Sequence, residues 1–164
     1  MVAEDLGSIT DDVCRLKNEL ALPGMRVLHF HGKERTDRRF SFDTEARCLA
    51  YTGTHDNNTT LGWYHDDLDE NGRRRLREAL GCAADVTDDA LMDAILAYLY
   101  SRRAETVIVP LQDILSLGSE ARMNRPGIVG GNWCWQLASA AAYRPYSGKL
   151  AALAYRYGRV NAED

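Results

Sequence analysis

The sequence predicts an α/β fold that corresponds to the C-terminal half of a (β/α)8 TIM barrel and contains four strand–helix units. Four short apolar segments alternate with segments of helical periodicity, and polar residues gather directly after the apolar ones. In such barrels the active site lies on the loops at the carboxyl ends of the strands. Because a complete barrel needs about 250 residues, the 164 residues are expected to form one partial catalytic domain, residues 1–164, without the N-terminal half.

The first two predicted strands lie close to the N-terminus. Met1–Glu4 is expected to be a strand that ends in an acid, and Thr10 then suits the N-cap of a helix with two acids in its first turn. Pro23 and Gly24 end this unit. The apolar segment Met25–Phe30 is the second predicted strand.

The third and fourth strands follow a charged loop, His31–Glu45. Leu49–Thr52 is the third predicted strand, Gly53 breaks it, and a helix is expected over Glu70–Leu80. Thr106–Pro110 is the fourth predicted strand. Its continuous apolar run is typical of a strand that is buried on both faces of a parallel sheet.

Two more helices complete the pattern. Thr87 suits the N-cap of a helix whose apolar stripe should pack on the sheet. That stripe consists of Leu91, Ala94, Ile95, Tyr98 and Leu99. A last helix is expected over Ser147–Arg156.

The composition excludes several classes of partner. The net charge of −4 leaves no basic surplus, so the basic run Arg73–Arg77 is interpreted as a solvated helix face and no nucleic-acid partner is expected. The four cysteines lack metal-ligand spacing, which predicts thiols in a reducing compartment and no metal site. No signal peptide and no apolar stretch of about 18 residues is found, so we expect a cytoplasmic protein without a membrane partner.

Two acids are expected to face each other across the mouth of the barrel. Glu4 ends the first predicted strand, and Thr52–Thr59 places His55 and Asp56 after the third. Two converging carboxyl groups suggest glycosidic chemistry, in which one acid protonates the leaving oxygen and further groups stabilise an oxocarbenium-like transition state. The alternative is that Asp56 is a helix N-cap and His55 a loop residue, without chemistry.

Six short segments of the sequence resemble the signatures of a known enzyme family. They are Ala3–Gly7, Leu22–Met25, Tyr51–Asn57, Pro110–Asp113, Leu117–Asn124 and Gly131–Trp133. In this order they resemble the signatures of the amylomaltase family, the 4-α-glucanotransferases that are called disproportionating enzyme in plants. The resemblance implies a glycoside-hydrolase-type barrel that transfers α-1,4-glucan segments between maltooligosaccharides by a retaining double displacement, without a metal or organic cofactor.

The resemblance also implies roles for single residues. Glu4 is the general acid/base, Asp56 stabilises the transition state, and His55 and Asn57 bind the substrate beside it. The nucleophilic Asp of the family lies on the preceding strand and has no counterpart in this sequence. Asp5 is a poor substitute, because neighbouring residues of a strand point to opposite sides. The chain alone is therefore expected to be inactive.

The loop after the fourth predicted strand holds further candidates. Within the family this region lines the sugar-binding cleft, which makes Arg122 and Asn124 candidate substrate-binding residues. An equally simple interpretation is that Arg122 pairs with Glu120 or Asp113 and holds the loop. Four aromatic residues, Trp63, Tyr64, Trp133 and Trp135, are expected to pack as core or to anchor loops rather than to stack on glucose rings.

Two positions and one segment depart from the family pattern. Asn58 stands where the family more usually has Asp, and Gln136 where it usually has Arg. Residues 31–40 lack the Pro-, Asn- and Tyr-rich segment of the family, which puts contacts to the acceptor sugar in doubt.

Two other functions remain open at this point. One is an α-glucan hydrolase or a debranching-type transferase on the same barrel, which the products from maltotriose would distinguish. The other is a catalytically silent fragment or a glucan-binding half-domain, which the absent nucleophile favours. Because half a barrel exposes strand edges, we expect the chain to dock with the missing N-terminal half-barrel, to self-associate or to remain loosely packed.

Overall fold

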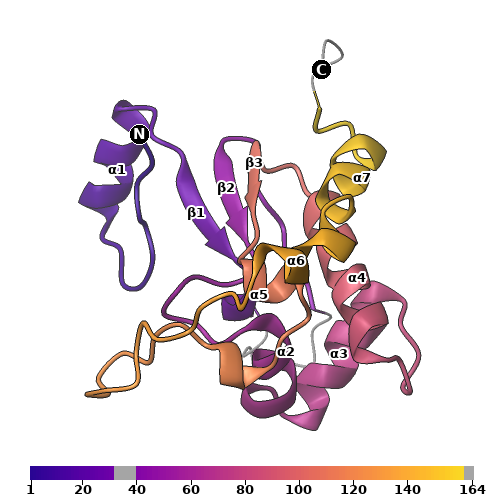
Figure 1. Ribbon diagram of the computed structural model, residues 1–164. Helices are drawn as coiled ribbons and strands as arrows, with labels where there is room; N and C mark the ends of the chain where they lie inside the picture. Colours follow the sequence, from indigo (N-terminus) through magenta and orange to yellow (C-terminus); the bar gives the residue numbers. More distant parts are fainter. Residues whose placement is uncertain (32–39, 161–164) are drawn as a thin grey trace.

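The computed structural model describes residues 1–31 and 40–160, and its centre is a three-stranded parallel sheet with the order β1-β2-β3 (Figure 1). The strands are β1 Gly24–Val27, β2 Cys48–Tyr51 and β3 Thr106–Ile108. Met25 lies opposite Leu49, which in turn lies opposite Thr106. Since the strands run in one direction, their carboxyl ends meet at one edge of the sheet, as the sequence predicts.

The predicted first strand is wrong, because Met1–Glu4 forms no strand in the structure. Ala3 N donates a hydrogen bond to Pro23 O over 2.9 Å, so the segment begins to run beside β1. The next step of a ladder is missing, because the Met25 amide donates to the Asp5 carboxylate instead of to a backbone carbonyl. The segment is therefore held by a side chain, and the described chain has three strand–helix units rather than four.

The helix α1, Asp11–Glu19, begins after Thr10 as predicted, although the Thr10 hydroxyl makes no capping hydrogen bond. Its apolar side chains Val13, Leu16 and Leu20 are about half exposed. The second strand is shorter than predicted, because Leu28–His31 forms a 3-10 helix. Residues 32–39, most of the predicted charged loop and of the departure at residues 31–40, lie outside the described residues.

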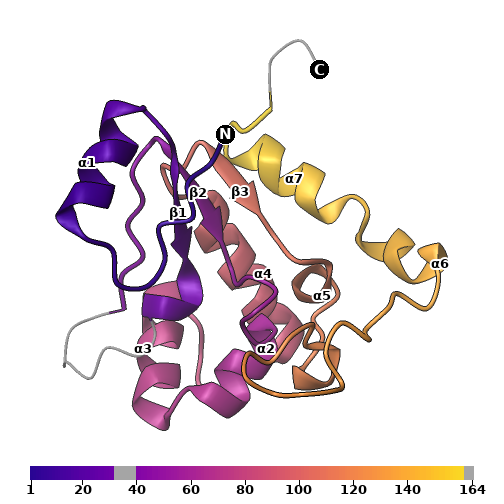
Figure 2. The ribbon, with the colours of Figure 1, turned by 90° about the vertical axis from the view of Figure 1, so that its left-hand side faces the viewer.

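The core lies between the sheet and the helices that follow β2. The chain continues with α2 Thr60–Gly62, a π-helical turn Trp63–Asp67, α3 Glu70–Leu80 and α4 Asp88–Tyr100. Figure 2 shows α4 behind the three strands, where it covers one face of the sheet. Ala50 of β2 joins Leu76 of α3 and Ile95 of α4 in one buried cluster. The predictions for α3, for α4 and for its Thr87 cap are confirmed.

The fourth predicted strand, β3, is shorter and more exposed than predicted. Val107 packs against the core cluster, whereas Thr106 and Ile108 are exposed. Burial on both faces is wrong because α4 covers one face only and β3 lies at the edge of the sheet.

Short helices and one long loop complete the chain. They are α5 Leu111–Ile114, a 3-10 helix Ser119–Ala121, α6 Ala140–Tyr143, a 3-10 helix Arg144–Tyr146 and α7 Lys149–Arg156. The helix α7 lies beside α4 (Figure 1), and Lys149 Nζ pairs with Asp93 Oδ1 over 2.6 Å. Within the described ranges, no helix has the length and apolarity that a membrane crossing requires.

Candidate active site

The main cleft lies at the carboxyl edge of the sheet and has a volume of about 760 Å³. Its wall combines the N-terminal segment, through Glu4, with the loop that follows β2, through His55 and Asp56. Tyr51 and Ile108 line it from the sheet. Asn57 lines it as well, so the structure brings four of the predicted site residues to one cleft, although Glu4 lies about 50 residues from the other three in the chain.

Glu4 reaches this cleft because its neighbour Asp5 anchors the segment on the other side. The Asp5 carboxylate accepts from Lys17 Nζ and from the Met25 amide, each over 2.6 Å. Arg26 Nη1 lies 3.6 Å from the same carboxylate. Asp5 is largely buried and Glu4 is exposed, so the two adjacent acids point to different surroundings.

The charges around Asp5 decide its protonation. Burial alone raises the pKa of this carboxyl, but the hydrogen bonds from Lys17 and Met25 and the charges of Lys17 and Arg26 outweigh it. The net effect is a pKa below the ordinary value. Asp5 therefore stays ionised as an anchor and carries no proton for catalysis near neutral pH.

The loop after β2 is held in a tight turn by Asn57. Its Oδ1 accepts from Thr54 N over 2.8 Å and from Thr54 Oγ1 over 2.9 Å. His55 Nε2 lies 3.3 Å from Asp56 Oδ1, and both side chains are about half exposed. The loop thus presents His55 and Asp56 to the cleft, while the carbonyl oxygen of the Asn57 side chain is used within the turn.

Arg122 and Asn124 hold Asp56 from the opposite side. Asn124 Nδ2 donates to Asp56 Oδ1 over 2.6 Å, and Arg122 Nη2 donates to the Asp56 backbone carbonyl over 2.8 Å. The alternative pairing of Arg122 is wrong, because Glu120 accepts from the Gly118 amide instead and Asp113 accepts from threonines. Arg122 and Asn124 therefore fix the loop after the fourth predicted strand, and their bonding partner is the catalytic candidate Asp56 in the loop after β2.

The aromatic residues divide into two groups. Trp63 and Tyr64 are buried under the loop, as predicted. Trp133 is 60% exposed and its ring centroid lies 5.2 Å from that of His55. Trp133 is therefore not a core residue; it lies beside His55, and its backbone amide donates to Met123 O.

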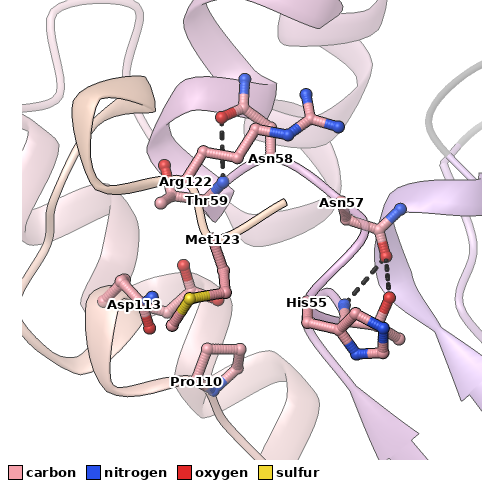
Figure 3. A pocket seen from close by; sticks show the side chains of 10 residues that line it. His55, Asn57, Asn58, Thr59, Pro110, Asp113, Arg122 and Met123 are labelled. Atoms are coloured by element: carbon pink, nitrogen blue, oxygen red, sulfur yellow. Dashed lines mark hydrogen bonds between the residues drawn. The ribbon is translucent and has the colours of Figure 1, made fainter. Parts of the chain in front are cut away.

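A smaller cavity of about 140 Å³ lies behind the His55 loop (Figure 3). Figure 3 shows His55 and Asn57 on one side of it and Pro110, Met123 and Asp113 on the other. Asp113 is 1% exposed and bonds to Thr52 and Thr60. Burial raises the pKa of Asp113 despite these hydrogen bonds. Sequence reasoning did not assign this residue to the site, although it ends the family-like segment Pro110–Asp113 and follows the fourth predicted strand.

The two departures near the site lie outside the main cleft. Asn58 is buried, and its amide donates to Ser119 Oγ over 2.9 Å, whereas Gln136 is exposed. Within residues 1–31 and 40–160, no group of three His, Cys, Asp or Glu side chains is arranged to hold a metal ion.

A parallel sheet with two carboxylates in a cleft at its carboxyl edge defines the chain as an α/β protein with an enzyme-type site. The 4-alpha-glucanotransferase family model matches residues 1–141, and the chain belongs to this family. This confirms the resemblance that the six sequence segments indicate.

Several known proteins are similar to the chain over nearly its whole length. The 4-alpha-glucanotransferase of Synechocystis sp. is 39% identical over 97% of this chain and 31% of its own length. The chloroplastic/amyloplastic enzyme of that name from Arabidopsis thaliana is 37% identical over 98% of this chain and 28% of its own length. The amylomaltase from Streptococcus agalactiae, solved in complex with acarbose, matches 98% of this chain with 32% of its own, at a TM-score of 0.86 and 27% identity. The chain thus spans about 30% of the length of the relatives it matches.

Proposed function

We propose that these residues supply the acid/base and transition-state-stabilising side of a 4-α-glucanotransferase active site, which transfers α-1,4-glucan segments between maltooligosaccharides. The observation that carries the proposal is that Glu4 and Asp56 line one cleft while Asp5, Asn124 and Arg122 fix the segments that bear them. Membership of the 4-alpha-glucanotransferase family supports the reaction class.

The chemistry follows from the positions of the two acids. Glu4 is exposed to the cleft, where it can protonate the leaving glycosidic oxygen and then deprotonate the incoming 4-hydroxyl of an acceptor sugar. The Asp56 carboxylate can stabilise the positive charge that develops on the sugar ring in the transition state. His55, at 3.3 Å from Asp56, can donate to a sugar oxygen. Exposed Trp133 beside His55 offers an aromatic face on which a glucose ring can stack.

The nucleophile of a retaining mechanism would have to lie about 5 Å from Glu4. Asp5 does not take this role, because its carboxylate is turned to Lys17 and Met25. In our proposal the nucleophile comes from the N-terminal part of a (β/α)8 barrel, and residues 1–164 are one part of that barrel's catalytic domain. The share of about 30% of the relatives' length supports this arrangement.

Completion of the barrel implies a partner for the exposed parts of the sheet. Ile108 of β3 is 40% exposed, and the apolar face of α1 is open as well. We expect these surfaces to be covered by the N-terminal half-barrel or by a second copy of the chain. Cytoplasmic localisation remains part of the proposal, and the four cysteines, which are free thiols in the structure, are consistent with a reducing compartment.

The experiment is product analysis from maltotriose. The complete product of the gene should form glucose and longer maltodextrins, whereas the 164-residue chain alone should form neither. Glu4→Gln should abolish transfer, while Glu105→Gln, at an exposed position outside the cleft, serves as the matched control. Glucose and maltose without longer products would instead show a hydrolase, and tight glucan binding without turnover would show a glucan-binding part.

A further inference from the structure

The loop that carries His55 and Asp56 has a buried anchor at each of its two ends, and one side chain supplies both. Thr52 directly follows β2, and its Oγ1 donates to Asp113 Oδ2 over 2.5 Å. Thr60 begins α2, and it donates twice: its amide to Asp113 Oδ1 and its hydroxyl to Asp113 Oδ2, each over 2.7 Å. Asp113 thereby ties together the two residues between which the loop runs.

The anchor is continued into the core by His29. The Thr60 hydroxyl has one proton, which it donates to Asp113, so its oxygen accepts from His29 Nε2 over 3.0 Å. The His29 ring stacks on Trp63, with 4.6 Å between the centroids and 12° between the planes. Gly53 packs so tightly on this ring that a Cβ atom would lie 2.7 Å from His29 Cε1. The loop thus starts from a base that is fixed by hydrogen bonds and by packing.

We propose that Asp113 is a positioning residue for Asp56 and His55, although it touches no substrate. This inference rests on the proposed function for its catalytic consequence, but not for its structural content. Arg122 and Asn124 hold Asp56 from the outside of the loop, and Asp113 fixes the two ends from the inside. A carboxylate suits this position because it only accepts hydrogen bonds, and all three groups that reach it are donors.

The expected consequence follows from how little displacement an active site tolerates. A shift of about 1 Å at a site far from the reacting atoms can cost about a hundredfold in rate. Asp113→Asn replaces one acceptor oxygen by an NH2 group, which faces a hydroxyl or an amide that also donates. Thr52→Val removes one hydroxyl at constant shape, and Thr52→Ser restores it.

The test begins with amide exchange and NMR of the complete gene product, because the 164 residues alone are expected to self-associate. The Thr54 and Asn57 amides are bonded within the loop and report on its order. We expect Asp113→Asn and Thr52→Val to speed their exchange about tenfold relative to the amides of α4. We also expect the side-chain amide signal of Asn124 to lose the shift that its hydrogen bond to Asp56 causes. Thr52→Ser and the exposed control Asp85→Asn should resemble the wild type.

Kinetics of the same protein supply a second measurement that does not depend on the amide signals. Asp113→Asn and Thr52→Val should lower kcat for maltotriose by roughly ten- to a hundredfold, with KM changed less than about threefold. Unchanged loop exchange, Asn124 signal and kcat in folded Asp113→Asn and Thr52→Val would overturn the positioning role. Loss of the loop signals in the two variants, together with a wild-type protein that transfers no glucan, would instead refute the proposed function and leave the positioning role intact.

Discussion

The two segments that carry the candidate acids are anchored by carboxylates in opposite electrostatic surroundings. Asp5, beside Glu4, is paired with Lys17 and lies near Arg26, which holds its pKa below the ordinary value despite its burial. Asp113, behind Asp56, is surrounded by hydroxyls and an amide of Thr52 and Thr60, and burial raises its pKa. The same residue type therefore anchors one segment as half of an ion pair and the other as the acceptor of a hydrogen-bond network.

The difference has a structural cause. The Asp5 segment lies at the outer edge of β1, where long basic side chains from α1 and β1 can reach it while remaining in contact with water. Asp113 belongs to α5 and is buried against the end of β2 and the start of α2, where the short side chains of Thr52 and Thr60 reach it. The anchor at the edge of the sheet thus depends on ion pairs, whereas the anchor in the interior depends on hydrogen bonds to uncharged groups.

Truncation of the two anchors should show the largest difference. Asp113→Ala leaves two hydroxyls and one amide in the interior without their acceptor, and we expect a loss of about 3 kcal/mol in the free energy of unfolding. Asp5→Ala frees Lys17 and Arg26 to turn to water, so we expect about 1.5 kcal/mol. Urea unfolding of the 164-residue chain at fixed protein concentration measures both, with Asp85→Ala as the surface control. A larger loss for Asp5→Ala would reverse the comparison.

One glycine lies against Asp5 and another against His29, the ring that bonds to Thr60 of the Asp113 network, which gives a second pair of variants. A Cβ on Gly53 would lie 2.7 Å from the His29 ring, which is locked on Trp63, so Gly53→Ala should cost about 2 kcal/mol. A Cβ on Gly24 would lie 2.3 Å from Asp5 Oδ2, the end of a side chain that can shift, so Gly24→Ala should cost about 1 kcal/mol. Thermal unfolding of both variants checks this order, and equal losses would show that the His29 ring yields as easily as Asp5.

The pH dependence of stability should have opposite signs at the two anchors. The lowered pKa of Asp5 contributes stability above the ordinary value of 3.8, and this is lost as pH falls through the folded-state pKa. The raised pKa of Asp113 contributes stability below 3.8, and this is lost as pH rises through the folded-state pKa. The stability difference between wild type and Asp5→Asn should therefore grow with pH, and that for Asp113→Asn should shrink. Urea midpoints from about pH 2.5 to 7 test both signs, and parallel curves would contradict them.

Salt should have the smallest effect and should act on one anchor only. Raising NaCl from about 0.05 to 0.5 M screens charges within a few ångströms of solvent, so the cost of Asp5→Asn should fall by a few tenths of a kcal/mol. The cost of Asp113→Asn should not change, because its named partners Thr52 and Thr60 are uncharged. A matching salt dependence at Asp113 would mean that a charged group contributes to its network.

Much of the fold follows from local sequence signals. Glu70–Leu80 and the helix after Thr87 are found where capping residues and apolar periodicity predict them. Met1–Glu4 fails as a strand because the Asp5 side chain takes the amide of β1 with which a ladder would continue, and no local pattern reports such a contact. The burial of β3 is mispredicted for a similar reason, since an apolar run does not reveal whether both faces of the sheet are covered.

The residues that line the cleft could be predicted from the sequence, but the buried residue that positions them could not. The motif around His55 and Asp56 and the acid at Glu4 could be read from the sequence, and the structure brings them to one cleft. Asp113 bonds to Thr52 and Thr60, which precede it by 61 and 53 positions in the chain. Such tertiary contacts have no signature in one sequence. The roles of Asn57, Arg122 and Asn124 in substrate binding stay predictions, because the structure shows only how they hold the loop.

Asp56, which Asn124 and Arg122 hold in place, is expected to act in the transition state together with Glu4. The most direct measurement is kcat and KM for maltotriose in the complete gene product carrying Asp56→Asn, with Asp85→Asn as the matched control. We predict that Asp56→Asn lowers kcat by at least about a hundredfold while KM changes much less, because the contacts of Asp56 strengthen as charge develops on the sugar. A raised KM with kcat retained would contradict this role and would make Asp56 a ground-state binding residue.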